Sequence, residues 1–223
     1  MSGEPFLAWP GWAQLRDAAL LSLAAALWFL LVYGGADRLT AHREFRVPVH
    51  TAAELSIPFV PAMTAFYMSL YGLFLLAPFV LRTRREFMAA VGTIAAAIAA
   101  GGIGFLLFPA ELAFAPVRDE QLGAWAGLYH LADRLNLTYN LLPSLHVAFA
   151  VICVAIFAPR ASGPVKALLW LWAALIAAST VLIHQHHVLD VVTGWLLALA
   201  CVGTVYRRLL RAAPARPADR ATS

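Results

Sequence analysis

The sequence is a succession of long apolar runs separated by shorter polar stretches. Six apolar runs can be identified, and they cover residues 18–33, 57–81, 87–108, 143–158, 164–183 and 188–206. A helix needs about 20 apolar residues to cross the hydrocarbon core of a bilayer. The fourth and sixth runs are short by this measure, so we expect them to extend into their polar flanks. The pattern predicts an all-α integral membrane protein that folds as a six-helix bundle.

The composition excludes a water-soluble domain. Hydrophobic residues make up 62% of the 223 positions and charged residues only 13%, whereas soluble domains carry about 25% charged residues. We expect one membrane-embedded domain over residues 1–206. The segment 207–223 is rich in Ala, Pro and Arg, and we expect a flexible, basic, cytoplasmic tail there. Cys153 and Cys201 lie inside apolar runs, which predicts buried small side chains rather than a disulfide.

The positions of the basic residues predict the orientation in the membrane. With six spans, 11 basic residues fall on the side that carries both termini and 5 fall on the opposite side. Positive charge is retained in the cytoplasm, so both termini should be cytoplasmic in a multi-pass protein of the plasma (inner) membrane. The connections 34–56, 109–142 and 184–187 then face the periplasm or the exterior. Because the arginines flank apolar runs, the pI near 9.4 does not indicate nucleic-acid binding.

Three arginines of the first outward connection oppose this charge preference, namely Arg38, Arg43 and Arg46. They could bind lipid headgroups or pair with acidic residues of the same connection, which are Asp37, Glu44 and Glu54. Alternatively, they serve an anionic substrate.

The first candidate site is Pro143-Ser144-Leu145-His146, at the start of the fourth apolar run. Proline favours the first turn of a helix, and the hydroxyl of Ser144 could cap the helix or contact a ligand. The free amide hydrogens at a helix N-terminus make a natural phosphate site. His146 would lie within that first turn and present a titratable group to the ligand.

The second candidate site runs from His184 to Asp190, at the start of the sixth apolar run. His186 and Asp190 are four residues apart, so on a helix they share a face. The carboxylate can accept one ring N–H of His186, which leaves the other nitrogen free as a nucleophile or a base. The cluster of His184, His186 and His187 could instead bind zinc, although no HExxH motif or cysteine ligand set accompanies it.

Several further residues are expected to be structural. His42, His50 and His130 are interpreted as ordinary loop residues. Two groups of glycines are expected to permit close helix packing; they are Gly101, Gly102 and Gly104, and the pair Gly123 and Gly127.

The two candidate sites together resemble the signatures of the type-2 phosphatidic acid phosphatase superfamily. Residues 143–146 are similar to its second signature, Pro-Ser-x-His, and residues 179–190 are similar to its third, Ser-Arg-x5-His-x3-Asp. Leu145 and the pair Tyr139-Asn140 resemble the branch related to inositol-phosphorylceramide and sphingomyelin synthases. The resemblance spans roughly residues 100–200, and the pair of motifs is more specific than either one alone.

The resemblance implies a role for each matching residue. His186 would be the nucleophile that forms a phospho-histidine, Asp190 would orient it, and His146 would protonate the leaving alcohol. Ser144 and Ser179 would contact the phosphate. The family needs neither a metal nor an organic cofactor for this chemistry, and its substrates are lipid phosphates.

Two positions depart from the family pattern. Thr180 stands where the third signature has arginine. The first signature has an Arg-Pro pair, whereas the nearest stretch here, residues 108–116, has Ala115 before Pro116. Arg118 is one candidate replacement for the missing cations, and the loop arginines 38, 43 and 46 are others.

The resemblance implies a membrane lipid phosphatase that hydrolyses a lipid phosphoester at the outer leaflet. A phospholipid headgroup phosphotransferase is the alternative, but a short chain without an obvious headgroup site favours water as the acceptor. A non-catalytic lipid-binding relative has no need for His146, His186 and Asp190 together. A transporter would carry its polar residues near the midplane rather than at helix ends.

Overall fold

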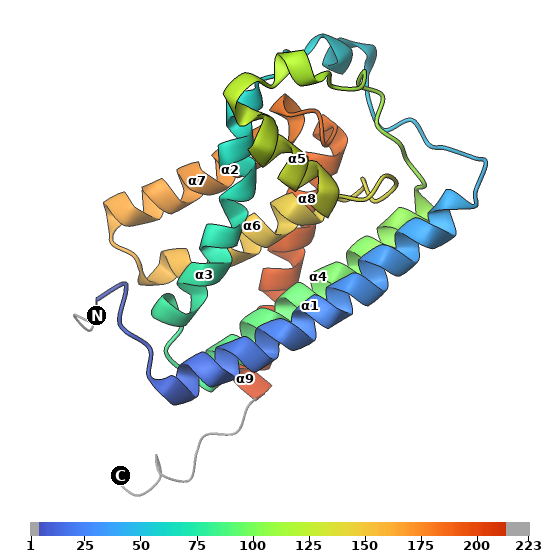
Figure 1. The fold of residues 1–223 in the computed structure, drawn as a ribbon. Helices are drawn as coiled ribbons and strands as arrows, with labels where there is room; N and C mark the ends of the chain where they lie inside the picture. Colours follow the sequence, from blue (N-terminus) through green and yellow to red (C-terminus); the bar gives the residue numbers. More distant parts are fainter. Residues whose placement is uncertain (1–4, 213–223) are drawn as a thin grey trace, which may run out of the picture.

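The computed structural model describes residues 5–212, which form a bundle of helices without a β-strand (Figure 1). The all-α prediction is therefore confirmed for this part of the chain. Five helical stretches are long and apolar enough to cross a membrane. They are α1 (Trp12–Ala41), the stretch Pro61–Val80, α4 (Arg84–Leu107), α7 (Gly163–Leu182) and the stretch Val188–Ala212.

Two of these stretches are composite. Pro61–Val80 consists of a 3-10 turn, α2 (Thr64–Met68) and α3 (Leu70–Val80). Val188–Ala212 consists of α8 (Val188–Cys201), a π-helical turn (Val202–Tyr206) and α9 (Arg207–Ala212). The last helix thus continues into the segment that we expected to be a flexible tail. The remainder of that segment lies outside the described residues.

The expected count of six spanning helices is not confirmed, because the fourth apolar run forms a shorter helix. α6 (Leu145–Phe157) has 13 residues and continues as a 3-10 turn to Arg160. Eleven of its 13 residues are buried, and it packs against α3, α4, α7 and α8. A helix that is apolar on every face is stable when other helices surround it. α6 therefore forms the centre of the bundle.

α1 lies along α4 at the edge of the bundle (Figure 1). A side chain at Gly102 of α4 would collide with Val32 of α1, so this glycine permits the close approach of the two helices. Gly104 packs in the same way, because a Cβ there would lie 2.6 Å from Pro143 Cδ. The prediction for this group is confirmed. The prediction for Gly123 and Gly127 is wrong, since a Cβ at either position would meet nothing within 4 Å.

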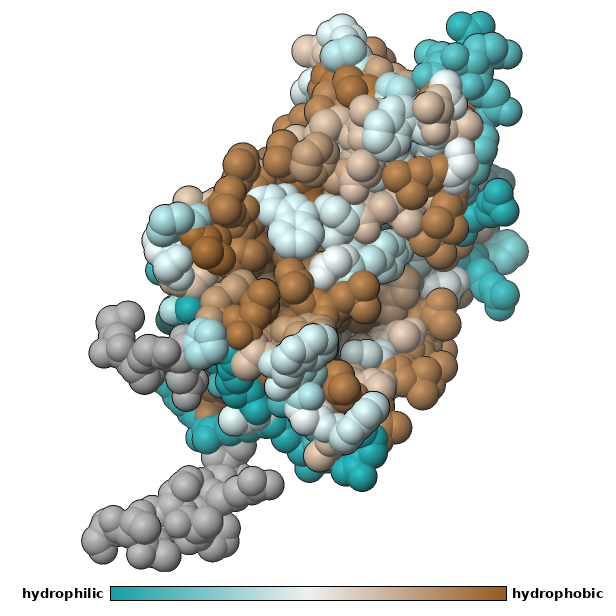
Figure 2. All heavy atoms as spheres, turned by 60° about the vertical axis from the view of Figure 1, so that its left-hand side comes forward, coloured by the Kyte–Doolittle hydropathy of each residue, from teal (hydrophilic) through white to brown (hydrophobic). Residues whose placement is uncertain are grey.

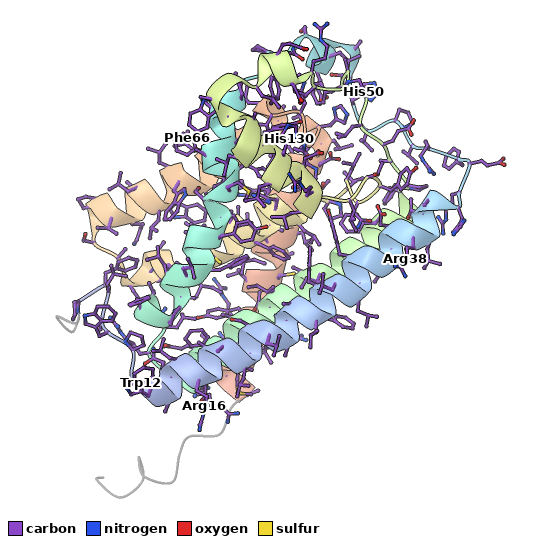
Figure 3. The ribbon with its side chains drawn as sticks, viewed as in Figure 1. Trp12, Arg16, Arg38, His50, Phe66 and His130 are labelled. Carbon is purple, nitrogen blue, oxygen red and sulfur yellow. The ribbon has the colours of Figure 1, made fainter. Side chains whose placement is uncertain are left out.

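The two ends of the bundle differ in character. Trp12 and Arg16 lie at the end where α1 begins and α9 finishes, whereas Arg38 and His50 lie at the opposite end (Figure 3). Figure 2 shows apolar side chains over the middle of one face and hydrophilic side chains mainly near its margins. This distribution is that of a protein whose middle is surrounded by lipid.

The connection 109–142 contains a helix that the sequence did not indicate. α5 (Ala126–Leu135) is short and amphipathic, and it packs against α2. His130 lies on this helix rather than in a loop (Figure 3). Together with the loops around residues 42–60 and 108–125, α5 covers the end of the bundle at which the candidate site lies.

Candidate active site

The turn between α7 and α8 positions the first candidate residue, His186. α7 ends at Leu182, and His184 adopts a φ of 57° in the left-handed region. The backbone N–H groups of Gln185 and His186 then both donate to the carbonyl oxygen of Thr180, at 2.9 and 3.0 Å. These bonds satisfy a carbonyl at the end of α7 and reverse the chain. His186 is thereby held just before the first turn of α8.

His186 and Asp190 form a buried pair at the start of α8. Nδ1 of His186 lies 3.3 Å from Oδ2 of Asp190, and Asp190 is fully buried. The same Oδ2 accepts the backbone N–H of His187 at 2.8 Å. A carboxylate can only accept, so the ring proton of His186 is on Nδ1 and Nε2 keeps its lone pair. The contact expected from the spacing is present, but His186 precedes α8 (Val188–Cys201), so the two residues do not share a helix face.

His146 lies in the first turn of α6, as expected, and its ring is held by Tyr67. The two rings stack with centroids 3.7 Å apart, and Nε2 of His146 lies 2.8 Å from the carbonyl oxygen of Tyr67. Because a carbonyl only accepts, Nε2 carries the proton and Nδ1 remains able to take or give one. Tyr67 was missed from the sequence, since it lies within an apolar run with nothing to mark it.

His146 and His186 line the same cavity, which has a volume of about 440 Å³. The cavity lies among α1, α3, α4 and α6, and most of its lining is apolar. Along α6 the lining extends from His146 to Phe157, which corresponds to a depth of about 16 Å at 1.5 Å per residue. The hydrocarbon core of one leaflet has a similar thickness, about 15 Å. The two histidines are therefore at one end of an apolar cavity about one leaflet deep.

A chain of polar side chains joins α2, α5 and the turn that carries His186. The hydroxyl of Tyr67 donates to Oδ1 of Asn136 at 2.7 Å. The amide of Asn136 donates to Oε1 of Gln185 at 2.8 Å. Asn136 also lines the cavity. Neither Asn136 nor Gln185 stood out in the sequence, because single amides in connections carry no recognisable pattern.

This arrangement lies within a region that matches a known family. The model of the PAP2 superfamily matches residues 113–213, a segment that contains His146, His186 and Asp190. This match supports the type-2 phosphatidic acid phosphatase superfamily. Its members are typically phosphoesterases or phosphotransferases, which supports an enzyme that acts on phosphoesters. No curated protein and no solved structure matches the chain. The closer resemblance to the inositol-phosphorylceramide synthase branch stays a prediction.

The two serines of the PAP2 signatures are fully buried and hydrogen-bonded within their own helices. Oγ of Ser144 accepts the backbone N–H of Val147 at 3.3 Å and caps α6. Oγ of Ser179 donates to the carbonyl oxygen of Ile176 at 2.6 Å. Neither serine is among the residues that line the cavity. The capping expected for Ser144 is confirmed, and the phosphate contact of both serines stays a prediction.

The structure does not bring the candidate arginines to the cavity. Arg38 and Arg118 are exposed, and the guanidinium of Arg43 donates to the carbonyl oxygen of Leu106. Arg46 lies 4.4 Å from the ring centroid of Tyr139. Among the described residues, those that line the cavity include no arginine or lysine. Arg38 lies in the last turn of α1 and the other three lie in loops, and none of the four lines the cavity.

The acidic residues near these arginines have other partners. Oδ1 of Asp37 accepts the backbone N–H of Tyr139 at 3.0 Å, and Glu54 binds the start of α8. The arginine that does pair is Arg46, whose Nε lies 3.8 Å from Oε2 of Glu111. The predicted pairing of the loop arginines with Asp37 and Glu54 is therefore wrong. Those carboxylates accept hydrogen bonds from the backbone instead.

The three neighbouring histidines do not form a joint ligand set. Nε2 of His184 donates to the carbonyl oxygen of Ile57 at 3.0 Å, His186 faces Asp190, and His187 contacts Glu54. Within residues 5–212, no group of three or more histidine, cysteine, aspartate or glutamate side chains is arranged to hold a metal ion. The zinc interpretation of this cluster receives no support from the geometry.

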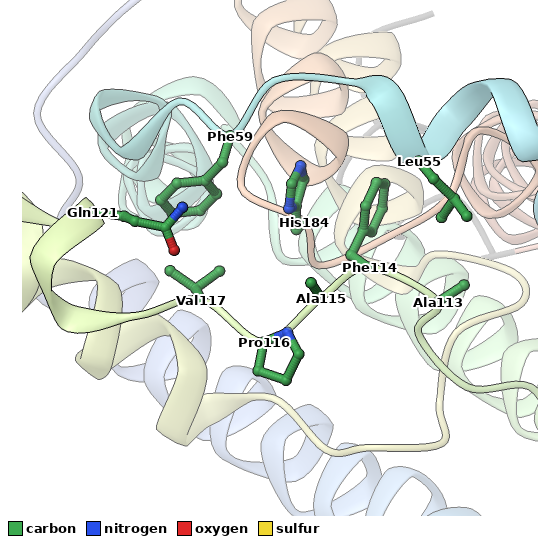
Figure 4. Close-up of a pocket in the computed structure, with 9 residues that line it drawn as sticks. All are labelled: Leu55, Phe59, Ala113, Phe114, Ala115, Pro116, Val117, Gln121 and His184. Atoms are coloured by element: carbon green, nitrogen blue, oxygen red, sulfur yellow. The ribbon is translucent and has the colours of Figure 1, made fainter.

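A second pocket of about 300 Å³ lies beside the turn between α7 and α8 (Figure 4). The rings of Phe114 and His184 stack with centroids 4.0 Å apart. The other lining residues come from the loops around residues 55–59 and 113–121 and include Phe59, Gln121 and the Ala115-Pro116 pair. Residues 113–116, within the stretch nearest to the first signature, thus form one wall of this pocket. No pattern in the sequence indicated a pocket here.

Proposed function

We propose that the protein is a membrane lipid phosphatase that hydrolyses a lipid phosphoester at the outer leaflet through a phospho-histidine. The observation that carries this proposal is the placement of His146 and His186 on one cavity, with Asp190 behind His186. A nucleophile oriented by a carboxylate and a second proton-transferring group are the parts that covalent phosphoryl transfer needs. The match to the PAP2 superfamily supports the same class of reaction.

The cavity supports a lipid as the substrate. Its depth of about 16 Å along α6 suits a hydrocarbon chain whose phosphate lies at the histidines. Ser22 and Leu30 of α1 and Tyr71 of α3 line the cavity and are also exposed. The cavity is therefore open to the surroundings between α1 and α3, where a chain can enter from the lipid.

The reaction proceeds in two steps, and in each step one bond to phosphorus forms while another breaks. The Nε2 lone pair of His186 attacks phosphorus, the bond to the lipid oxygen breaks, and Nδ1–H of protonated His146 gives its proton to that oxygen. Asp190 stabilises the positive charge that develops on the His186 ring. A water oxygen then attacks phosphorus, its proton goes to Nδ1 of His146, and the P–N bond breaks to release phosphate.

The orientation of the protein supports the outer leaflet as the place of reaction. The candidate site lies toward the end of the bundle opposite to Trp12 and α9. By the six-span count on the sequence, the side on which the first helix begins has the larger share of the basic residues, 11 of 16. By the charge preference of membrane proteins, the end at which α1 begins is cytoplasmic, and the site faces the periplasm or the exterior of a plasma membrane.

The experiment that tests the proposal is phosphate release by the purified protein from a panel of lipid phosphates in detergent micelles. The panel contains phosphatidate, phosphatidylglycerol phosphate and a polyprenyl diphosphate. We expect release from at least one of them, and none from His186→Ala. Release that persists in His186→Ala would contradict the mechanism, and no release from any member would contradict the function.

A phosphotransferase is the second candidate, because the structure has a pocket that the sequence did not reveal. The pocket beside His184 has room for the headgroup of an acceptor alcohol, and a phospho-histidine reacts with whichever hydroxyl is held in line. Assays with added diacylglycerol, ceramide or inositol distinguish the two. A new phospholipid that forms at the expense of free phosphate would favour transfer over hydrolysis.

A further inference from the structure

A second carboxylate–histidine pair lies directly beside the first. Glu54 belongs to a 3-10 turn (Ala52–Ser56) in the first outer loop, and it is 9% exposed. Its Oε2 lies 3.5 Å from Nδ1 of His187, whose side chain is fully buried. The two residues are 133 positions apart in the sequence, so only the fold brings them together. A buried carboxylate in an outer loop is unusual unless it has specific partners.

Glu54 uses both carboxylate oxygens to join the loop to α8. Oε2 accepts the backbone N–H of Val188, the first residue of α8, at 2.8 Å. Oε1 accepts the backbone N–H and the hydroxyl of Thr51, at 3.0 and 3.1 Å. Burial opposes the charged form of Glu54, but these hydrogen bonds outweigh it and lower the pKa of the carboxyl. A negative charge at this position also interacts favourably with the helix dipole.

His187 is fixed from the opposite side by the second outer loop. The backbone N–H of Ala113 donates to its Nε2 at 3.1 Å. Nε2 is therefore unprotonated, and the neutral ring carries its proton on Nδ1, toward Glu54. The ring also lies between Phe114 and His50, with centroids 4.7 and 5.0 Å away. One imidazole thus connects both outer loops to the turn that carries His186.

The backbone of His187 leads directly to the candidate catalytic pair. Its N–H donates to Oδ2 of Asp190 at 2.8 Å, and this is the oxygen that faces Nδ1 of His186 at 3.3 Å. The position of the His187 backbone therefore determines where the Asp190 carboxylate lies. Glu54 accepts the Val188 N–H and lies 3.5 Å from Nδ1 of His187, an atom without a hydrogen-bond partner among the described residues. Glu54 therefore contacts the two residues that lead to this carboxylate.

We propose that Glu54 and His187 are positioning residues, an inference that rests on the proposed function. They keep the Asp190 carboxylate in place against the His186 ring. Glu54 contacts the turn but does not line the cavity, so it acts through Asp190 rather than on the substrate. Loss of either residue loosens the turn at residues 183–190. The orientation of the nucleophile, and with it the rate of phosphoryl transfer, then suffers more than substrate binding does.

The test uses the full chain in detergent and five variants: Glu54→Ala, Glu54→Gln, His187→Phe, the double variant Glu54→Ala/His187→Phe, and Glu44→Ala. Glu44 is an exposed acid of the same loop and serves as the control. Turnover is measured as phosphate release from phosphatidate micelles, or from the panel lipid that the wild type hydrolyses fastest. Hydrogen exchange of the backbone amides is measured over residues 183–192. Thermal unfolding of each variant shows how much of it is folded.

We expect Glu54→Ala to lower kcat by roughly 10–100-fold with little change in KM, and to speed hydrogen exchange at residues 183–192. Glu54→Gln retains an oxygen that can accept from Val188 and should lose less. Because the two residues act through one carboxylate, the double variant should be little worse than the poorer single variant. Glu44→Ala should match the wild type in both measurements.

Wild-type kcat and exchange in folded Glu54→Ala would overturn the inference, as would a loss that only follows the unfolded fraction. Additive losses in the double variant would show that the two residues act separately, which also overturns it. If the wild type releases no phosphate from any lipid, the proposed function fails. The exchange measurement then still decides whether Glu54 stabilises the turn. Unchanged hydrogen exchange at residues 183–192 in Glu54→Ala would show that the contact between Glu54 and Val188 does not stabilise it.

Discussion

The backbone N–H of Ser144 donates to the carbonyl oxygen of Asp190 at 3.0 Å. This bond joins the N-terminus of α6 to the N-terminus of α8. His146 follows Ser144 by two residues and His186 precedes Asp190 by four, so the bond sets the distance between the two candidate catalytic turns. Each turn is specified locally, but their juxtaposition depends on how closely α8 approaches α6.

Gly194 of α8 permits this approach, and its replacement is the first prediction. A Cβ at this position would collide with the carbonyl oxygen of Ser144 and lie 3.3 Å from its Cβ. Since the obstacle includes backbone, we expect Gly194→Ala to destabilise the protein by about 1–3 kcal/mol and to reduce phosphate release.

Gly203, later in the same composite helix, provides the matched control for that change. A Cβ there meets nothing within 4 Å, so Gly203→Ala should be neutral or stabilising by about 0.5–1 kcal/mol. Thermal unfolding in detergent compares the two variants. Equal melting temperatures for both would show that the contact at Ser144 does not limit the packing of α8.

His186→Ala is expected to lower kcat much more than Asp190→Asn does. Removal of the nucleophile abolishes the covalent route and should lower kcat by about 10⁴-fold or more. Asp190→Asn keeps a side chain of similar size but cannot stabilise the charged ring, so some turnover should remain. Rapid quenching should detect acid-labile phosphate on the wild type and none on His186→Ala. Equal losses in both variants would contradict the separate roles.

The effect of His146→Ala should depend on the leaving group of the substrate. A leaving alcohol of high pKa needs protonation as its bond to phosphorus breaks, whereas a phenolic leaving group needs little help. We expect a loss of about 10²–10⁴-fold on a lipid phosphate and a much smaller loss on an aryl phosphate. The same loss on both substrates would assign His146 to binding or folding instead of proton transfer.

The orientation in the membrane can be tested with single cysteines at exposed positions. His42 and Glu120 lie in the outer connections and Ser162 in an inner one, and all three are exposed. Cysteines at 42 and 120 should react with an impermeant thiol reagent in intact cells, whereas a cysteine at 162 should react only after lysis. The native Cys153 and Cys201 are buried and give little background. The reverse labelling pattern would place the site in the cytoplasm.

His187 should make the stability of the protein depend on pH. Burial lowers the pKa of its ring, although Asp190 partly opposes this. The unfolded chain, with an ordinary pKa of about 6.5, then binds more protons than the folded one. The contribution of His187 is therefore complete above about pH 6.5 and is lost as the pH falls. Melting temperatures at pH 8 and pH 5.5 should differ more for the wild type than for His187→Phe.

Glu54 adds to this dependence only at more acid pH. Its lowered pKa means that its contribution is present above the ordinary pKa of a glutamate, about 4.3, and is lost below it. Measurements between pH 5.5 and 8 thus exclude the contribution of Glu54, and the comparison with His187→Phe separates His187 from the other histidines. Identical pH dependence in the wild type and His187→Phe would show that the histidine is not responsible.

The local pattern of the sequence was sufficient for the helices and for part of the site. Apolar runs form membrane helices because the bilayer leaves the backbone no other partner than itself, so the run 87–108 predicts α4 (Arg84–Leu107) closely. The spacing of four residues suggested the His186–Asp190 pair, although the turn before α8, rather than the helix itself, places His186. Ser144 caps α6 for an equally local reason.

Contacts between distant segments could not be predicted in this way. Tyr67 stacks on His146 from 79 residues away, and Glu54 binds Val188 from 134 residues away. The arginines of the outer loops were expected near the phosphate site because of their charge, but the fold directs them to backbone carbonyls, Glu111 and solvent. Charge alone does not specify a partner when several lie within reach of a loop.

The short helix α6 shows which properties follow from local sequence and which follow from tertiary packing. Its sequence determined that it is apolar and helical, because backbone hydrogen bonding and side-chain hydrophobicity act over a few residues. Only the tertiary structure decided that it lies at the centre, with a cavity along one side and the turn of α8 against its start. Packing depends on the shapes of several helices at once, and no single stretch of sequence contains that information.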